Sequence, residues 1–235
     1  LEIIPFLKEK NHNKWLQEFH KLYEKEYETV IKDQINPTKE GLTMGEVIDK
    51  INKETNGEAV FASDVGQNQM FAWRYGNFVK TRSNITSGGL GTMGFGLPAA
   101  IGAKMGVPDR EVIAILGDGG LQMTIQELGT ILQSNIAVKI VVLNNNFLGM
   151  VRQWQELFFE KRYASTGMKN PDFIKIAEGY GIEAKKVTKR EELSDAIKRM
   201  VSSKNSYFLE VLIEQEDNVF PMVSSGSSVS DIRLS

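Results

Sequence analysis

Two short polar segments have residue types suited to holding a phosphate ester through a metal ion. Segment 117–120 reads Gly-Asp-Gly-Gly and follows the apolar run 112–116, while the three asparagines 144–146 follow the apolar run 140–143. Asp118 offers a carboxylate and the asparagines offer carboxamide oxygens, which are ligands that Mg²⁺ prefers. Glycine lets the backbone approach phosphate oxygens closely. Together the segments predict a site for magnesium and a phosphate ester.

Each segment taken alone also has a plain structural interpretation. Asp118 alone is typical of a helix cap, and a run of asparagines alone is typical of a turn. Their joint position at the ends of two buried runs favours a ligand site instead. A helix that we expect to begin near Thr124 offers its N-terminal amides to an anion at the same place.

The elements that must position these segments alternate along the chain. Apolar, β-branched runs predict four strands, at 59–63, 112–116, 140–143 and 207–213. Apolar spacing predicts five helices, at 98–105, 124–133, 149–159, 171–180 and 190–201. Buried strands separated by helices indicate an α/β fold with a doubly wound, mostly parallel sheet and helices on both faces. Such sheets bind ligands at the carboxyl ends of their strands, where both polar segments lie.

The composition changes along the chain and predicts three parts. Residues 1–40, with Trp15 and Phe19 at helical spacing, predict a peripheral helix and a linker from a preceding domain. Residues 41–222 predict the α/β domain, which opens with a helix capped by Thr43 and Glu46. The Ser-rich residues 223–235 predict a flexible C-terminal tail. Because the sequence starts with Leu1 rather than Met, we expect a piece of a longer chain.

The composition excludes several chemistries. The sequence has no cysteine, and its two histidines are His12 and His20, so disulfides, a cysteine nucleophile and cysteine-ligated zinc are excluded. A Ser-His-Asp triad would have to use the N-terminal segment. With 28 basic and 30 acidic residues the formal net charge is −2, which gives no electrostatic reason to expect nucleic acid or a membrane as partner. No apolar run is long enough to span a membrane, and we expect a cytoplasmic location.

The spacing of the two polar segments resembles the thiamine diphosphate motif. Twenty-four residues separate Gly119 from Asn144, and a Gly-Asp-Gly followed at about this distance by Asn-Asn defines that motif. In detail the chain resembles the large catalytic subunits of acetolactate (acetohydroxyacid) synthases, specifically their C-terminal thiamine diphosphate-binding domain. The resemblance covers essentially the whole chain and is carried by segments 66–70, 86–100, 117–128 and 143–155 and by Pro221 and Met222.

The resemblance implies roles for individual residues. Asp118, the Asn145 side chain and the main-chain carbonyl of Phe147 would ligate magnesium. Main-chain amides of Gly119, Gly120, Gln67 and Asn68 would bind the diphosphate. This sequence departs from the family at Asn68, where the family usually has His, although an amide can still donate a hydrogen bond. The full implied cofactor-binding set is Val65, Gly66, Gln67, Asn68, Gly91, Met93, Asp118, Gly119, Gly120, Asn145, Phe147, Leu148, Gly149 and Met150.

Three of these residues, together with Trp154, would act around the thiamine rings and the substrate. Met93 would be an apolar wedge that bends the cofactor, and the Gly91 carbonyl would accept a hydrogen bond from the aminopyrimidine. Met150 and Trp154 would line the substrate channel. From pattern alone, Met93, Met150 and Trp154 are more typical of core packing, so their functional roles rest on the resemblance.

The resemblance also implies an activity and partners. The whole enzyme would decarboxylate pyruvate and condense the product with pyruvate or 2-oxobutyrate, the first common step of branched-chain amino-acid biosynthesis. The glutamate that activates the cofactor would lie in a separate N-terminal domain of a partner subunit in a homodimer or tetramer. No catalytic residue of that kind is therefore expected in this sequence, and the fragment would be inactive alone. FAD would bind mainly to another domain, and a regulatory small subunit is a possible partner.

Three other interpretations stay open at this point. The first is another thiamine diphosphate-dependent decarboxylase or carboligase. The second is an NAD-dependent oxidoreductase, because segment 89–94 fits the dinucleotide fingerprint and Asp109 lies twenty residues beyond Gly89. That motif is weak alone, and residues 82–84 before it make a poor strand. The third is a module that binds the cofactor without catalysis.

Overall fold

The computed structural model describes residues 4–8, 10–215 and 217–234. The chain forms two compact units, one of Leu1–Asp33 with Phe220–Ser235 and one of Gln34–Val219. Leu1, on which the expectation of a longer chain rests, lies outside the described residues, as does Ser235 at the end of the predicted tail. Within the described ranges, no helix has both the length and the apolar character needed to cross a bilayer.

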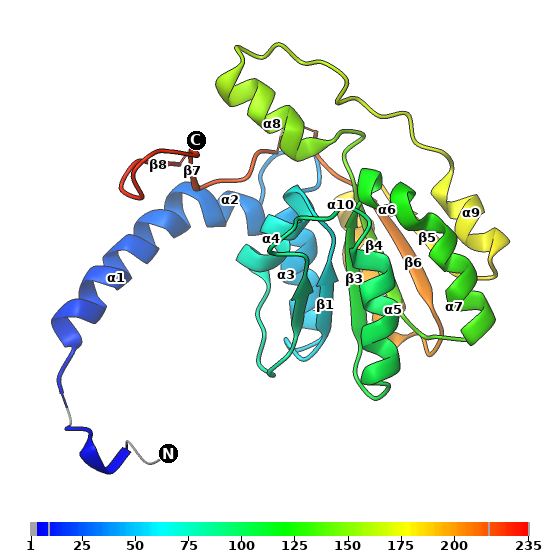
Figure 1. Ribbon diagram of the computed structural model, residues 1–235, viewed down its shortest axis with the longest axis horizontal. Coiled ribbons are helices and arrows are strands. Elements are labelled where there is room, and N and C mark those ends of the chain that lie inside the picture. The colour runs from blue at the N-terminus through cyan, green and yellow to red at the C-terminus, as the bar shows by residue number, and fades with distance from the viewer. Residues whose placement is uncertain (1–3, 9, 216, 235) are drawn as a thin grey trace. The chain divides into compact units, whose positions relative to one another are not determined.

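The second unit is built on one six-stranded sheet whose strands all run parallel (Figure 1). Its order is β2-β1-β3-β4-β6-β5, so the chain winds outward in both directions from β1 and β3. The strands are β1 (Val60–Ser63), β2 (Asn84–Thr86), β3 (Val112–Gly117), β4 (Lys139–Asn144), β5 (Glu183–Val187) and β6 (Tyr207–Leu212). This confirms the predicted parallel α/β sheet and its four apolar strands.

Helices cover both faces of this sheet. The first face carries α3 (Met44–Glu54), α4 (Gln67–Tyr75) and α10 (Arg190–Ser202), and the second carries α5 (Gly96–Gly106), α6 (Asp118–Thr124), α7 (Leu128–Ser134) and α9 (Phe173–Gly179). Side chains of β3 alternate between the faces: Ile113 and Ile115 join the first core cluster, and Ala114 and Leu116 join the second. The doubly wound arrangement is therefore confirmed. Helix α8 (Gly149–Phe158) lies beyond the carboxyl edge of the sheet (Figure 1).

Several elements differ from the sequence-based predictions. The predicted start of the helix at 124–133 is wrong. Helix α6 begins at Asp118, and a 3-10 turn at Ile125–Glu127 separates it from α7. Glycines 119 and 120 disfavour a helix, but Leu121 is fully buried and its packing holds this turn. Strands β2 and β5 and helix α4 were not predicted. The two strands lie at the sheet edges and lack the continuous apolar pattern of a buried strand.

The first unit contains the predicted amphipathic helix. It comprises a 3-10 turn (Ile4–Phe6), α1 (Asn13–Glu26) and a π-helical stretch (Tyr27–Ile31), and α2 (Lys32–Ile35) continues from it into the second unit. The aromatic side chains of Trp15 and Phe19 are exposed and contact each other edge to face. Near the C-terminus, β7 (Met222–Val223) pairs antiparallel with β8 (Ile232–Arg233), and all of these residues except Met222 lie in the predicted tail 223–235. The part boundaries at 40/41 and 222/223 stay predictions.

Helix α3 begins with the capping box that the sequence predicts. The Thr43 hydroxyl accepts from the Glu46 N–H at 3.2 Å, and the Glu46 carboxylate accepts from the Thr43 N–H at 3.0 Å. The same hydroxyl donates to the Gln34 carbonyl at 2.6 Å, while Glu46 also pairs with Arg190 of α10. The cap therefore joins the start of α3 to α2 and to α10.

We predict that Thr43→Ala lowers the free energy of unfolding by about 1–2 kcal/mol, because alanine cannot accept the hydrogen bond from the Glu46 N–H. The matched variant Thr43→Ser keeps the hydroxyl and should stay within about 0.5 kcal/mol of the parent. Urea denaturation followed by circular dichroism measures both. Equal losses for the two variants would contradict the capping role.

Candidate functional site

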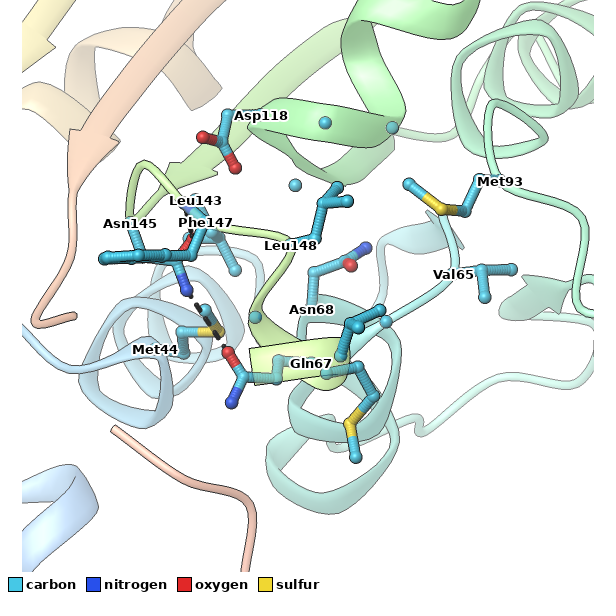
Figure 2. A pocket seen from close by; sticks show the side chains of 17 residues that line it. Met44, Val65, Gln67, Asn68, Met93, Asp118, Leu143, Asn145, Phe147 and Leu148 are labelled. Atoms are coloured by element: carbon cyan, nitrogen blue, oxygen red, sulfur yellow. Dashed lines mark hydrogen bonds between the residues drawn. The ribbon is translucent and has the colours of Figure 1, made fainter. Parts of the chain in front are cut away.

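A pocket opens at the carboxyl edge of the sheet, among the loops that follow β1, β3 and β4 (Figure 2). Every predicted cofactor-binding residue except Gly91 lines it. The predicted residues that the structure brings together there are Val65, Gly66, Gln67, Asn68, Met93, Asp118, Gly119, Gly120, Asn145, Phe147, Leu148, Gly149 and Met150.

The register of two central strands brings the predicted metal ligands to one side of this pocket. Gly117 of β3 pairs with Leu143 of β4, so Asp118 and Asn145 follow neighbouring strand ends. Both side chains are buried, with residue exposures of 1% and 3%. Figure 2 shows them on the same side of the pocket as Phe147, whose N–H donates to Asn145 Oδ1 at 3.1 Å. The carboxylate, the carboxamide and the nearby backbone are a donor set suited to a hard cation.

The Asp118 carboxylate is desolvated but well supported by neighbouring amides. Burial raises the pKa of the Asp118 carboxyl above its ordinary value, and a hydrogen bond from Asn170 opposes this rise. Asn170 Nδ2 lies 2.7 Å from Asp118 Oδ2 and also reaches Asn144 Oδ1 and Asn146 Oδ1 at 3.0 and 3.2 Å. A cation beside Asp118 would favour its charged form. Sequence reasoning missed Asn170, because nothing local marks a residue that acts 52 positions away.

Three helices begin at the pocket and direct their N-termini toward it. The first residues of α4, α6 and α8 line it, together with the cap residues Gly66, Gly117 and Leu148. Free N–H groups at helix starts carry partial positive charge and bind anions. No lysine, arginine or histidine lies among the described residues that line the pocket. A phosphate-bearing ligand would therefore depend on these N-termini and on a bound cation for its charge balance.

Both glycines that follow Asp118 have close neighbours. A Cβ on Gly119 would lie 2.8 Å from Leu148 Cδ2, and one on Gly120 would lie 2.5 Å from Asp64 Oδ1. Asp64 is fully buried, and its carboxylate accepts from the N–H groups of Gly94 and Gly96 at 3.0 and 2.9 Å. Asp64 thus ties the loop before α5 to the end of β1, and Gly120 must leave room for that carboxylate.

The residues predicted to contact the thiamine rings and the substrate lie in different places. Met93 and Met150 are half-buried and line the pocket, so neither belongs to the core clusters. Gly91 lies outside the pocket lining, in the left-handed region at φ +63°. Trp154 also lies outside the lining; it is 40% exposed and its ring contacts Phe158.

The loop after β1 leads directly into α4. Gln67 and Asn68 belong to the first turn of that helix. The Asn68 side chain is buried and donates to the Ile115 carbonyl at 2.9 Å, so this amide is directed at β3. Three further lining residues were not predicted, because apolar strand and helix positions carry no chemical signal: Met44, Leu143 and Val151. Gly117, from the predicted segment 117–120, also lines the pocket.

The fold and the pocket define an α/β domain with a pocket at the carboxyl edge of a parallel sheet, where three helix N-termini suit a phosphate-bearing ligand. The family model described as "Thiamine pyrophosphate enzyme, C-terminal TPP binding domain" matches residues 64–211, which include the whole pocket lining except Met44. The chain belongs to this family. Thiamine pyrophosphate is the same compound as thiamine diphosphate.

Curated relatives narrow the comparison to acetolactate synthases. The chain is 46% identical over 192 residues to the mitochondrial acetolactate synthase of Schizosaccharomyces pombe, covering 80% of this chain and 29% of the relative. It is 46% identical over 193 residues to the large subunit from Corynebacterium glutamicum, covering 80% and 31%. It is 40% identical over 223 residues to the mitochondrial catalytic subunit from Saccharomyces cerevisiae, covering 94% and 32%. The chain thus spans about three tenths of the length of these relatives.

A solved structure supports the same fold. The thiamine diphosphate-dependent 4-hydroxybenzoylformate decarboxylase of Rhodococcus jostii RHA1 superposes with a TM-score of 0.70 at 26% sequence identity. The match covers 77% of this chain and 34% of that one. The predicted thiamine diphosphate-binding fold is therefore confirmed.

We predict that Gly120→Ala lowers the free energy of unfolding by about 1–3 kcal/mol, because the new methyl group meets the Asp64 carboxylate and must displace it. The control is Gly102→Ala in α5, where a Cβ meets nothing within 4 Å. That change should leave stability equal or raise it by up to about 1 kcal/mol, since alanine favours a helix over glycine. Chemical denaturation compares the two, and a Gly120→Ala protein as stable as the control would contradict the close contact.

Proposed function

We propose that this chain binds thiamine diphosphate together with Mg²⁺, with Asp118, the Asn145 side-chain oxygen and the Phe147 main-chain carbonyl as the protein's metal ligands. The observation that carries the proposal is the charge of the pocket. Its described lining contains a buried carboxylate and no basic side chain. A diphosphate would be repelled by Asp118 unless a divalent cation lay between them.

The diphosphate would lie against the helix N-termini at the pocket. Main-chain amides of Gly119 and Gly120 at the start of α6, and of Gln67 and Asn68 at the start of α4, would donate to its oxygens. Residues Gly66 and Gly149 carry no side chain that would narrow the approach. These groups would hold the ligand without any lysine or arginine from the pocket lining.

On the thiamine side, the apolar residues would set the cofactor's shape. Met93 would press against the rings, with its Cε 3.6 Å from the Cβ position of Gly119. The Gly91 carbonyl would accept from the aminopyrimidine, and Val65 and Leu148 would complete the apolar wall. When bound, the cofactor supplies a nucleophilic thiazolium carbon, a chemistry that no protein side chain provides by itself.

For the whole protein we propose acetolactate synthase activity: decarboxylation of pyruvate and condensation with pyruvate or 2-oxobutyrate in branched-chain amino-acid biosynthesis. The 40–46% identity to acetolactate synthases supports this assignment. Met150 lines the pocket and Trp154 lies one turn further along α8, in keeping with a substrate channel along that helix. The activating glutamate and the FAD site would lie in other domains, with a homodimer or tetramer and a regulatory small subunit as proposed assemblies.

Two further points stay at the level of proposals. The cytoplasmic location expected from the sequence stays a prediction, and several relatives carry mitochondrial or chloroplastic in their names. The structural similarity to a 4-hydroxybenzoylformate decarboxylase favours, as the second candidate function, another thiamine diphosphate-dependent 2-oxo acid decarboxylase or carboligase. Product analysis of the full-length protein with pyruvate separates the two: the first gives acetolactate, and a simple decarboxylase gives acetaldehyde.

We predict that Asp118→Ala abolishes Mg²⁺-dependent binding of thiamine diphosphate in the full-length protein that carries this chain, because it removes the one charged metal ligand. Isothermal titration calorimetry with and without Mg²⁺ measures this binding. Asp195→Ala, which removes an exposed carboxylate on α10, is the control and should bind like the parent. Unchanged affinity in Asp118→Ala would refute the metal assignment.

Thermal shifts with two candidate ligands test the dinucleotide interpretation. We expect thiamine diphosphate with Mg²⁺ to raise the melting temperature of the full-length protein and NAD to leave it unchanged, because a ligand stabilises the folded state that binds it. In the structure, the Gly94 N–H donates to the buried Asp64 carboxylate and is occupied within the protein. A shift with NAD alone would contradict the proposed function.

A further inference from the structure

The orientation of the Asn145 carboxamide decides whether it can ligate a cation. One end of this group is an oxygen and the other is an NH₂ that can only donate. In the structure, Asn145 Oδ1 accepts from the Phe147 N–H at 3.1 Å, which leaves its second lone pair available. Asn145 Nδ2 donates to Gln67 Oε1 at 3.2 Å. The Phe147 N–H and Gln67 together therefore select the orientation in which one lone pair of the oxygen remains available for a cation.

The orientation of Gln67 is itself fixed by two acceptors. Its Nε2 donates to Gln153 Oε1 and to the main-chain carbonyl of Asp217, both at 3.1 Å. If the Gln67 amide turned over, its oxygen would face these two oxygens, and its NH₂ would face the NH₂ of Asn145. Gln67 is only 5% exposed, so water cannot readily replace the lost hydrogen bonds.

Gln153 of α8 connects this arrangement to the backbone. Its Oε1 accepts from the Val219 N–H at 2.9 Å, and its Nε2 donates to the Val219 carbonyl at 3.0 Å. A backbone N–H cannot become an acceptor, nor a carbonyl a donor, so these two bonds allow Gln153 one orientation. The side chain is fully buried. The Val219 backbone thus orients the Gln153 amide, Gln153 orients the Gln67 amide, and Gln67 contacts the Asn145 amide.

The space around these side chains is filled closely. A Cβ on Gly149, at the start of α8, would collide with Gln67 Oε1 and lie 2.8 Å from Asn145 Nδ2. Gly149 is therefore required for the contact between Gln67 and Asn145. Figure 2 shows that contact as a dashed line between the two side chains.

We propose that Gln153 is a positioning residue for the metal site: through Gln67 it holds Asn145 with Oδ1 available to the cation. We name Gln153, Gln67 and Asn145 the amide relay. The inference rests on the proposed magnesium site and adds a residue that touches neither metal nor cofactor. Partners that orient a metal's ligands typically change metal affinity by about 10- to 100-fold when they are lost.

Metal affinity in the full-length protein tests the amide relay. Mn²⁺ serves as the probe, and electron paramagnetic resonance of free Mn²⁺ gives its dissociation constant at saturating thiamine diphosphate. We expect Gln153→Met, which keeps the length of the side chain but loses its hydrogen bonds, to weaken Mn²⁺ binding at least about tenfold.

A structural control separates positioning from stability. Asn52→Leu removes another buried amide, whose Nδ2 donates to the Tyr75 carbonyl on the first face of the sheet. It should lower the melting temperature but leave Mn²⁺ affinity within about twofold of the parent. If Gln153→Met retains parental Mn²⁺ affinity, or if Asn52→Leu loses as much affinity as Gln153→Met, the amide relay has no positioning role.

If Gln153→Met does not fold, a second variant tests the amide relay. Asn145→Asp is nearly isosteric and adds a negative charge, which by charge alone should tighten cation binding. The amide relay opposes it, because Gln67 Oε1 would then face a carboxylate oxygen, and we expect no gain in Mn²⁺ affinity. Binding tenfold tighter than the parent would overturn the proposal. Should the parent itself bind no Mn²⁺ with thiamine diphosphate, the proposed function fails first.

Discussion

The pocket places a buried carboxylate where the proposed ligand brings further negative charge. Asp118 lies at the end of β3, burial raises the pKa of its carboxyl, and no described lining residue is basic. A divalent cation and three helix N-termini would resolve this conflict, because both supply positive charge without a cationic side chain. The parallel register of β3 and β4, which sets Asp118 beside Asn145, is the geometric condition for such a site.

Hydrogen bonds around the pocket fix the orientation of the side chains and loops that line it. Asn170 holds one oxygen of Asp118, and Asp64 holds the loop that carries Met93 through the N–H groups of Gly94 and Gly96. Asp64, Asp118 and the two glycines are buried, so an alternative orientation there would leave donors or acceptors unpaired at a cost of about 1–3 kcal/mol each. The atoms that would contact the proposed ligand are thus positioned by the protein itself, which favours tight binding of a cofactor.

Local patterns in the sequence predict the parts of this structure that local physics determines. The apolar runs of β3 and β4 and the capping box at Thr43 depend on neighbouring residues, and they appear as predicted. The family resemblance also implies the cofactor-binding residues, which the structure brings together in one pocket apart from Gly91. Edge strand β5 was missed because its exposed charged residues lack a buried strand's pattern. Asn170 and Gln153 act across 52 and 86 residues, and only the folded chain reveals such contacts.

The central claim is that Asp118, Asn145 and the Phe147 carbonyl share one cation with a diphosphate. A crystal structure of the full-length protein grown with thiamine diphosphate and Mn²⁺ tests it most directly, with anomalous scattering locating the manganese. The account predicts one anomalous peak within about 2.5 Å of oxygens from all three residues, adjacent to density for the diphosphate. Cofactor density in this pocket without a peak there, or a peak held by other residues, would contradict it.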